Sequence, residues 1–176
     1  MNQPQASPPL IGFVATSGTG KTTLLEKIIP ILKDNNCRPG LIKHAHHDFE
    51  IDYPGKDSFR LRKAGAHETM IGSRNRWALI HENNTYLTEP ALFDLLSKMS
   101  LHELDVILVE GFKHEQYPKI LLHREALQQD INQYIDQQTI AVASDIKPPI
   151  TKNLPLLDIN NPQQIAHFIL QRIAAK

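Results

Sequence analysis

One short run, FVATSGTGKTTLL, contains the residue types that hold a nucleotide phosphate. Gly18 and Gly20 allow the tight, partly left-handed backbone that turns consecutive N–H groups toward an anion. Lys21 could reach the outer phosphate oxygens, and the Thr22 hydroxyl could bind Mg²⁺. The pattern G-x-x-x-x-G-K-[ST] also requires a glycine where this chain has Ala15. Because alanine adds only one methyl group, we expect it to be tolerated if its φ is negative.

The residues around this run predict a strand, a loop and a helix in that order. Leu10–Thr16 is apolar throughout, as a strand buried on both faces should be. Thr22–Asn35 has aliphatic residues at helical spacing, and we expect Pro30 to kink this helix or end it early. A buried strand followed by a helix N-terminus is the context that a phosphate-binding loop requires. Thr16 occupies the place of a signature lysine, so the sequence does not support the subclass defined by that lysine.

A second buried strand, predicted over Asp105–Glu110, ends in an acidic residue. Ligands of parallel sheets bind at the carboxyl ends of strands, so Glu110 is our candidate to hold Mg²⁺, directly or through water. Gly111 follows it and would let a backbone approach a ligand. The alternative is a surface carboxylate just past a core strand. Asp52 is a candidate second acid, unless it stabilises the turn at Pro54-Gly55.

Other polar residues could contribute to such a site. The turn Ser73–Arg76 offers two arginines, which suit phosphates or nucleotide edges but could equally be solvated. Lys113 could meet an anion, and Asp145 could accept hydrogen bonds from guanine or cap its own strand. The run His46-His47-Asp48 is spaced too closely for a closed zinc site, and we favour a polar binding loop there.

The remaining pattern alternates strands with helices and predicts a three-layer α/β domain. We expect a mostly parallel sheet of about eight strands plus an antiparallel hairpin formed by Glu68–Gly72 and Trp77–Glu82. The Gln-rich stretch Glu125–Gln138 is only weakly helical. Further strands are predicted at Arg38–Ala45, Lys119–Arg124, Thr139–Ser144 and Pro155–Ile159, and helices at Asp57–Ala64, Pro90–Met99 and from Pro162, capped by Asn161, to about Ile173.

Length and composition limit the classes of protein. The 176 residues suit a single domain, with residues 1–9 as a flexible arm, and 41% hydrophobic residues suffice for a core. A formal net charge of zero gives no signal for nucleic acid or an anionic membrane. The single cysteine, Cys37, suits a reducing compartment. We expect no signal peptide, because the first residues are polar and Pro-rich, and no apolar run is long enough to cross a membrane. We therefore expect a cytoplasmic protein.

Together these segments resemble the molybdopterin-guanine dinucleotide biosynthesis protein B (MobB) family. The resemblance is carried, in order from residue 17 to residue 145, by SGTGKTTLLEKIIP, RPGLIKHAHHD, DYPGKDSFRLRKAGA, RWAL, LDVILVEGFKHE and IAVASD. The loop alone is unspecific, because many nucleotide hydrolases share it, whereas LIKHAHHD, PGKDS and LVEGFKHE in series are much more specific.

The resemblance implies a homodimeric P-loop protein that binds GTP and Mg²⁺ and has weak GTPase activity. It also implies an adapter or nucleotide supplier for the molybdopterin guanylyltransferase, with molybdopterin or its guanine dinucleotide as a further contact. By motif, Lys21, Asp52 and Glu110 would serve catalysis, and Thr22, Asp52 and Glu110 the metal. The nucleotide would contact Gly18, Thr19, Gly20, Lys21, Thr22, Thr23, Ser73, Arg74, Asn75, Arg76, Gly111, Phe112 and Lys113.

Two other functions stay open from the sequence. A small-molecule kinase would share the loop and would need an arginine-rich lid, for which Arg60, Arg62 and Lys63 are candidates, although a solvated helix face explains them more simply. A non-catalytic interaction module could use the loop only to sense a nucleotide.

Overall fold

A computed structural model describes residues 7–45, 49–83 and 89–175. The chain forms two compact units, which are described separately: a larger one of residues 1–44 and 91–176, and a smaller one of residues 45–90. That the whole chain acts as a single nucleotide-binding domain stays a prediction. Most of the expected N-terminal arm lies outside the described residues, but Pro9 accepts a hydrogen bond from Ile107 N at 2.9 Å, so this end of the arm is attached to the sheet.

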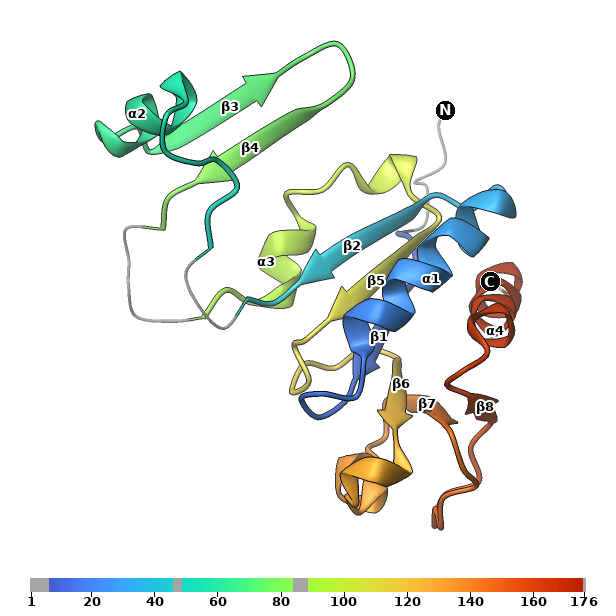
Figure 1. Cartoon of the computed structure of the whole chain (residues 1–176). Coiled ribbons are helices and arrows are strands. Elements are labelled where there is room, and N and C mark those ends of the chain that lie inside the picture. Colours follow the sequence, from blue (N-terminus) through green and yellow to red (C-terminus); the bar gives the residue numbers. More distant parts are fainter. Residues whose placement is uncertain (1–6, 46–48, 84–88, 176) are drawn as a thin grey trace. The chain divides into compact units, whose positions relative to one another are not determined.

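A six-stranded sheet, parallel at every pairing, forms the centre of the larger unit (Figure 1). Its order is β2-β5-β1-β6-β7-β8. The strands are β1 (Leu10–Val14), β2 (Pro39–Lys43), β5 (Val106–Glu110), β6 (Lys119–His123), β7 (Thr139–Ser144) and β8 (Leu156–Asp158). The predicted α/β class, parallel sheet and antiparallel hairpin are confirmed, but the sheet has six strands where we expected about eight.

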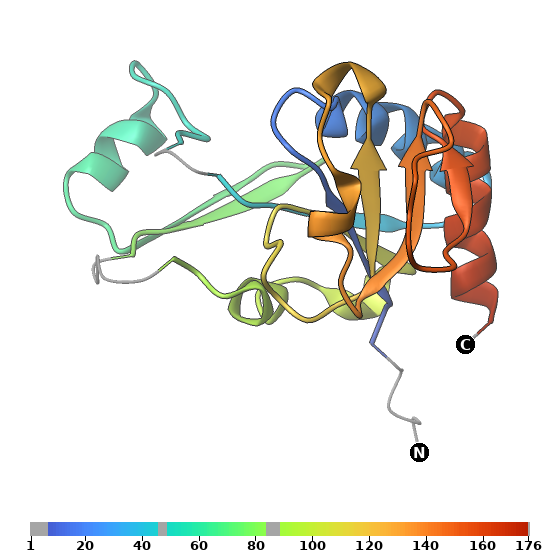
Figure 2. The ribbon, with the colours of Figure 1, turned by 90° about the horizontal axis from the view of Figure 1, so that it is seen from below.

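Helices and irregular segments cover the two faces of this sheet (Figure 2). Alternate residues of each central strand enter opposite cores, as the two-residue period of a strand requires. Phe13 and Leu108 pack with α1 (Lys21–Asp34) and α4 (Pro162–Ala174), whereas Ile107 and Val109 pack with α3 (Leu92–Leu96). The 3-10 helices are η1 (Leu101–Glu103), η2 (Glu125–Leu127) and η3 (Ile131–Tyr134).

Two predicted elements, and one of the two effects expected of Pro30, differ from the structure. Pro30 lies inside α1 and does not end it early, because Ile28 and Leu32 on either side are fully buried and hold the helix on the core. The predicted helix Pro90–Met99 is only the five residues of α3. The stretch Glu125–Gln138 forms η2 and η3, since its polar residues supply no continuous apolar face. The predicted cap of α4 is confirmed, because Asn161 Oδ1 accepts from Gln164 N at 3.0 Å.

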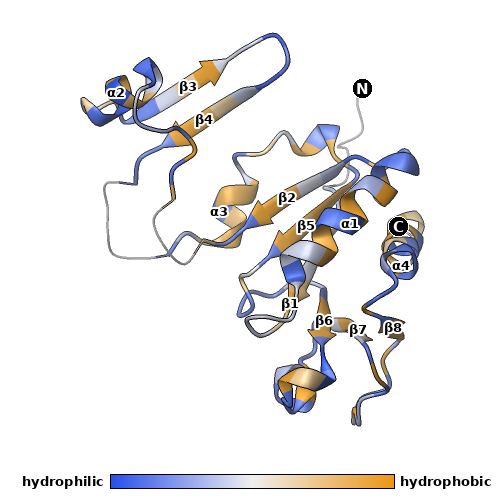
Figure 3. Ribbon diagram, in the orientation of Figure 1, coloured by the Kyte–Doolittle hydropathy of each residue, from blue (hydrophilic) through white to orange (hydrophobic). Residues whose placement is uncertain are grey.

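In the smaller unit, α2 (Asp57–Lys63) precedes the antiparallel strands β3 (Glu68–Gly72) and β4 (Trp77–His81). Arg62 is buried and donates hydrogen bonds to the carboxylates of Glu50 and Glu82. This residue is therefore an internal connection between segments of the unit, and the expectation of a solvated arginine on this helix is wrong for it. Both strands carry apolar residues (Figure 3), yet much of that apolar surface is exposed, including Met70 and Trp77.

Within the described residues, no helix combines the length and the apolar character needed to cross a membrane.

Candidate functional site

The loop between β1 and α1 has the backbone geometry that an anion site needs. Gly18 and Gly20 adopt positive φ angles of 81° and 92°, which side-chain-bearing residues rarely adopt. Gly20 is the N-cap of α1 and offers no side-chain cap, so the first N–H groups of this helix stay available to a ligand. Ala15 is absent from the described non-glycine residues with positive φ, so the backbone condition under which we expect alanine to be tolerated is met.

The loop is held together by its own side chains. Thr19, only 1% exposed, donates its hydroxyl hydrogen bond to Thr16 O at 2.9 Å. Lys21 extends back across the loop and donates from Nζ to Ala15 O at 3.1 Å and to Thr16 O at 3.3 Å. Burial lowers the pKa of Lys21, nearby Lys43 lowers it further, and Glu110 opposes both effects. The loop is therefore preformed around a partly desolvated ammonium group.

The predicted Mg²⁺ residues of the larger unit are in contact. Thr22, in the first turn of α1, donates its hydroxyl hydrogen bond to Glu110 Oε1 at 3.1 Å. Glu110 is the last residue of β5 and lies beside Phe13 of β1, so the sheet places its carboxylate at the base of the loop. It is only 8% exposed, and the alternative of a surface carboxylate is wrong.

Glu110 has a second polar neighbour that the predicted site did not include. Lys43, the last residue of β2, is paired in register with Glu110, and its Nζ lies 3.4 Å from Glu110 Oε2. The same Nζ lies 3.5 Å from the Thr22 hydroxyl oxygen. The sequence places Lys43 near the end of a strand predicted over Arg38–Ala45, but only the strand order, with β5 between β1 and β2, brings it to this carboxylate.

The backbone directly after Glu110 is confined. Gly111 has a φ of 100°, and a Cβ atom added there would lie 2.6 Å from the Cβ of His44. Phe112 also has a positive φ, 51°, and its ring meets the His44 ring edge-on at 4.9 Å. Tyr117 donates its hydroxyl hydrogen bond to Gly111 O at 2.7 Å. A non-glycine residue in this conformation beside a candidate ligand site is typical of functional loops.

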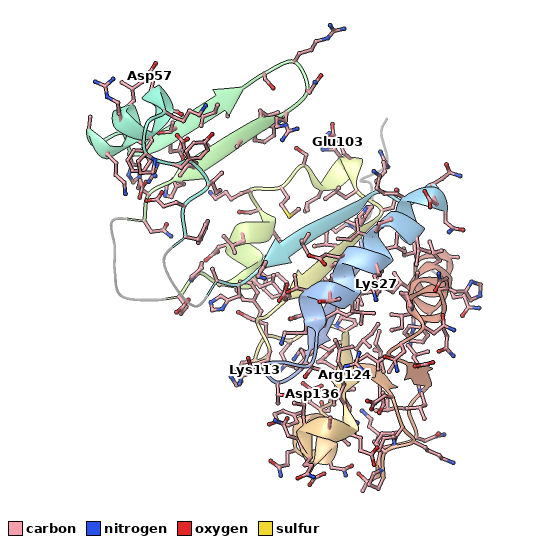
Figure 4. The ribbon with its side chains drawn as sticks, in the orientation of Figure 1. Lys27, Asp57, Glu103, Lys113, Arg124 and Asp136 are labelled. Atoms are coloured by element: carbon pink, nitrogen blue, oxygen red, sulfur yellow. The ribbon has the colours of Figure 1, made fainter. Side chains whose placement is uncertain are left out.

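Lys113 and Arg124 follow β5 and β6 at the same carboxyl-end edge (Figure 4). The Lys113 side chain is exposed, while its carbonyl oxygen accepts from the buried Lys119 Nζ at 2.7 Å. Arg124 is a residue that the sequence did not single out. It donates from Nε to Thr19 O at 3.1 Å, and its guanidinium lies 3.6 Å from Asp145 Oδ2. Arg124 thus ties the loop to the ends of β6 and β7.

An open hollow of about 640 Å³ adjoins these strand ends. The carboxylate of Asp145 lies on its wall and already accepts from Glu125 N at 3.0 Å. The strand-end role that was the alternative for Asp145 is therefore present. The hollow is lined by His123, Glu125, Ala126, Gln128, Gln129, Asp145, Ile146 and Pro149.

Five of the predicted site residues belong to the smaller unit. Asp52 is buried, with Oδ1 accepting from Tyr53 N, while Oδ2 has no hydrogen-bond partner within the described part of the chain. Ser73, Arg74, Asn75 and Arg76 form the turn between β3 and β4, closed by a hydrogen bond from Ser73 N to Arg76 O at 2.8 Å. Ser73 Oγ also donates to Arg76 O, so this serine serves the turn itself.

No group of three or more His, Cys, Asp or Glu side chains is placed to hold a metal ion in the ranges 7–45, 49–83 and 89–175. The His46-His47-Asp48 run lies outside these ranges.

Comparisons with known proteins match most of the chain. A family model described as molybdopterin guanine dinucleotide synthesis protein B matches residues 10–145, a segment that contains both Lys21 and Glu110. A molybdopterin-guanine dinucleotide biosynthesis adapter protein of Escherichia coli (strain K12) is 51% identical over 164 residues, which cover 93% of this chain and 92% of that protein. A protein of the same name from Haemophilus influenzae is 43% identical over 162 residues, covering 92% of this chain and 87% of the relative.

A solved structure agrees with these matches. The crystal structure of Bacillus subtilis MobB superposes with a TM-score of 0.71 at 27% sequence identity, covering 93% of this chain and 97% of that one.

Proposed function

This chain belongs to the molybdopterin guanine dinucleotide synthesis protein B family, and from that membership we propose that it is a GTP-binding adapter in the biosynthesis of molybdopterin guanine dinucleotide. We further propose that it hydrolyses GTP slowly. Its protein partner would be the guanylyltransferase that joins GMP to molybdopterin, and molybdopterin or its guanine dinucleotide would be a further contact. The adapter role is supported by the names of the two relatives above.

One observation carries the nucleotide-binding part of the proposal: the loop is preformed, with Lys21 held across it and Thr22 in contact with Glu110. The free N–H groups and positive dipole of the α1 N-terminus would attract a phosphate. Lys21 would exchange its two carbonyl partners for phosphate oxygens. Exchanging a neutral for an anionic partner is favourable for an ammonium group that burial has partly desolvated.

The residues present fit a magnesium ion. Mg²⁺ requires oxygen ligands, and the Thr22 hydroxyl and the buried Glu110 carboxylate supply two within 3.1 Å of each other. That Asp52 of the smaller unit supplies a further oxygen ligand stays a prediction from the sequence. When bound, Mg²⁺ would neutralise charge on the nucleotide phosphates. Glu110 and Thr22 would hold it at the base of the loop.

The slow hydrolysis that we propose fits the side chains around the loop. Arg124 is occupied by Thr19 O, Asn160 Oδ1 and Asp145, so it is not free to stabilise a transferring phosphate. Nucleotide hydrolases without a positioned arginine or glutamine turn over slowly until a partner supplies one.

The base would occupy the hollow at the ends of β6 and β7, where Asp145 could accept from the guanine N1 and N2 groups. Arg74, Asn75 and Arg76 of the smaller unit stay candidates for further nucleotide contacts, as do Thr23, Phe112 and Lys113 of the larger one.

We also propose a homodimer. The smaller unit supports this proposal, because Met70, Leu79 and Trp77 are exposed on one face of its hairpin. Apolar residues gathered in this way mark interaction surfaces.

The Lys21→Ala variant tests the nucleotide site. Calorimetric titration with GTP and Mg²⁺ should show an affinity at least about tenfold lower than that of the wild type, since one charge-assisted contact to phosphate is lost. Affinity for guanosine should not change. Equal GTP affinity in both proteins would refute the site, and competition with ATP at fixed Mg²⁺ would show whether guanine is preferred.

Incubation with GTP and Mg²⁺, with and without molybdopterin, separates this function from its alternatives. GDP and phosphate without an acceptor support the slow GTPase. Phosphate transferred to a small acceptor would indicate a kinase, and binding without any turnover would indicate a nucleotide-sensing module.

A further inference from the structure

A lysine of the chain itself already contacts the two groups proposed to hold Mg²⁺. Lys43 Nζ lies 3.4 Å from Glu110 Oε2 and 3.5 Å from Thr22 Oγ1, while Thr22 donates to Glu110 Oε1 at 3.1 Å. Three groups from β2, β5 and α1 thus form a closed triangle. The pairing of Lys43 with Glu110 in the register of neighbouring strands fixes this arrangement.

In the site without nucleotide, the ion pair with Lys43 reduces the cost of burying the Glu110 carboxylate. Glu110 is 8% exposed, and a buried carboxylate is costly unless a cation or hydrogen bonds compensate it. Lys21 is engaged with the carbonyl oxygens of Ala15 and Thr16, so it does not form this ion pair. Lys43 is the cation in direct contact with Glu110, while Lys21 interacts with this carboxylate without an ion-pair contact.

The ammonium group of Lys43 is also able to move away from Glu110. Its side chain is 51% exposed, whereas that of Glu110 is 11% exposed, so the ammonium lies at the solvent side of the pair. Lysine carries a compact charge on a flexible four-carbon stem. Moving the Lys43 side chain exposes little buried surface, because it is already half-exposed. Solvent screening also keeps a half-exposed ion pair weak.

We propose that Lys43 is a built-in cation that competes with Mg²⁺ for Glu110 and Thr22, and that binds the nucleotide phosphates once the metal displaces it. The proposal rests on the nucleotide site proposed above. Two cations cannot share one carboxylate and one hydroxyl at these distances without repulsion, so metal binding releases the ammonium. The released group stays at the carboxyl-end edge, close enough to Lys21 for their charges to interact, where a phosphate would need a second cation. Metal and nucleotide thereby favour each other's binding.

The Lys43→Met variant removes the charge and keeps a similar length of apolar stem. The nucleotide-free chain is titrated with Mn²⁺, an oxygen-seeking probe for Mg²⁺, while the electron paramagnetic resonance signal of free Mn²⁺ is followed. We expect Lys43→Met to bind Mn²⁺ about two- to fivefold more tightly than the wild type, the range that a partly exposed ion pair supplies. By calorimetry at saturating Mg²⁺, the same variant should bind GTP about tenfold more weakly, because a phosphate contact is lost.

Two controls accompany this variant. Lys43→Arg keeps the charge and should not show the gain in Mn²⁺ affinity that Lys43→Met shows. Lys27→Met removes an exposed lysine of α1 (labelled in Figure 4) and should change neither affinity by more than about twofold.

The opposite signs of the two shifts distinguish competition from a structural role, since a damaged site would lose both affinities. Unchanged or weaker Mn²⁺ binding in Lys43→Met, with normal GTP binding by the wild type, would overturn the inference and leave the proposed function intact. Tighter Mn²⁺ binding in a protein whose wild type binds no GTP would support the competition and refute the proposed function. A wild type that binds neither ligand would refute both.

Discussion

At the scale of single residues, conformational constraint concentrates after Glu110. Gly111 and Phe112 both have positive φ, and Gly111 lies against His44 with no room for a side chain. The backbone of His44 donates to Glu110 O at 2.8 Å, so this constraint and the candidate metal ligand belong to one connected piece of structure.

Gly111→Ala should therefore be costly. An alanine with φ near 100° costs about 1–2 kcal/mol, and its Cβ at 2.6 Å from that of His44 adds overpacking, so we expect about 2–4 kcal/mol less free energy of unfolding in urea denaturation. Gly72→Ala is the matched control, because open space surrounds its added Cβ and its φ is not positive. Similar losses in both variants would contradict this account.

At the scale of elements, a buried lysine connects β6 to the segment before β7. Lys119, 3% exposed, donates to Asp136 Oδ2 at 3.1 Å and to Lys113 O. Burial disfavours the charged form of Asp136, but hydrogen bonds from Thr139 and Lys119 outweigh it and hold the pKa of this carboxyl below its usual value. The anchored segment includes the loop that bears Lys113.

Asp136→Asn should destabilise the chain by about 1 kcal/mol at pH 7, since solvent screens the partly exposed carboxylate. A folded-state pKa below the unfolded value of about 3.9 means that the carboxylate stabilises the fold above that pH. This contribution disappears as the pH falls through the lowered pKa. Urea denaturation between pH 7 and pH 2 should accordingly show the difference between wild type and variant shrinking at acid pH. A difference that stayed constant over this range would exclude the ion pair as its cause.

At the scale of the whole molecule, the smaller unit exposes an apolar hairpin face. Met70 pairs with Leu79, and Gly72 with Trp77, so these side chains share one face, with Met70 66% and Trp77 61% exposed. A hairpin of two strands is marginal by itself, and the buried Arg62 with its two carboxylates holds the unit together from within.

We expect the proposed homodimer to bury this face. The double variant Met70→Ser/Trp77→Ser should sediment with the 20.0 kDa mass of one chain at a concentration where the wild type shows twice that mass. Leu61→Ser, exposed on α2, is the control and should sediment as the wild type does. A wild type that sediments as one chain at all concentrations would refute the homodimer itself.

The sequence by itself determined the local parts of this protein. The apolar run of β1, the glycines of the loop and the amphipathic α1 predict a strand, a loop and a helix, because each depends on spacing and on the conformational freedom of nearby residues. The same reasoning placed Glu110 at the end of a buried strand. It overestimated the length of α3, which has only five residues, and the helical character of the polar 125–138 stretch, which has no strong local preference.

Only the tertiary structure decided which strand ends meet. Because β5 lies between β1 and β2, Glu110 contacts Thr22 on one side and Lys43 on the other. Glu110 is 88 residues from Thr22 and 67 residues from Lys43 in the sequence, so the spacing of residues along the chain does not reveal these contacts. Arg124 likewise became a support of the loop only because β6 lies beside β1. Strand order follows from long-range burial of apolar faces. The contact of Lys43, the second cation of the site, with Glu110 could therefore be found only from the fold.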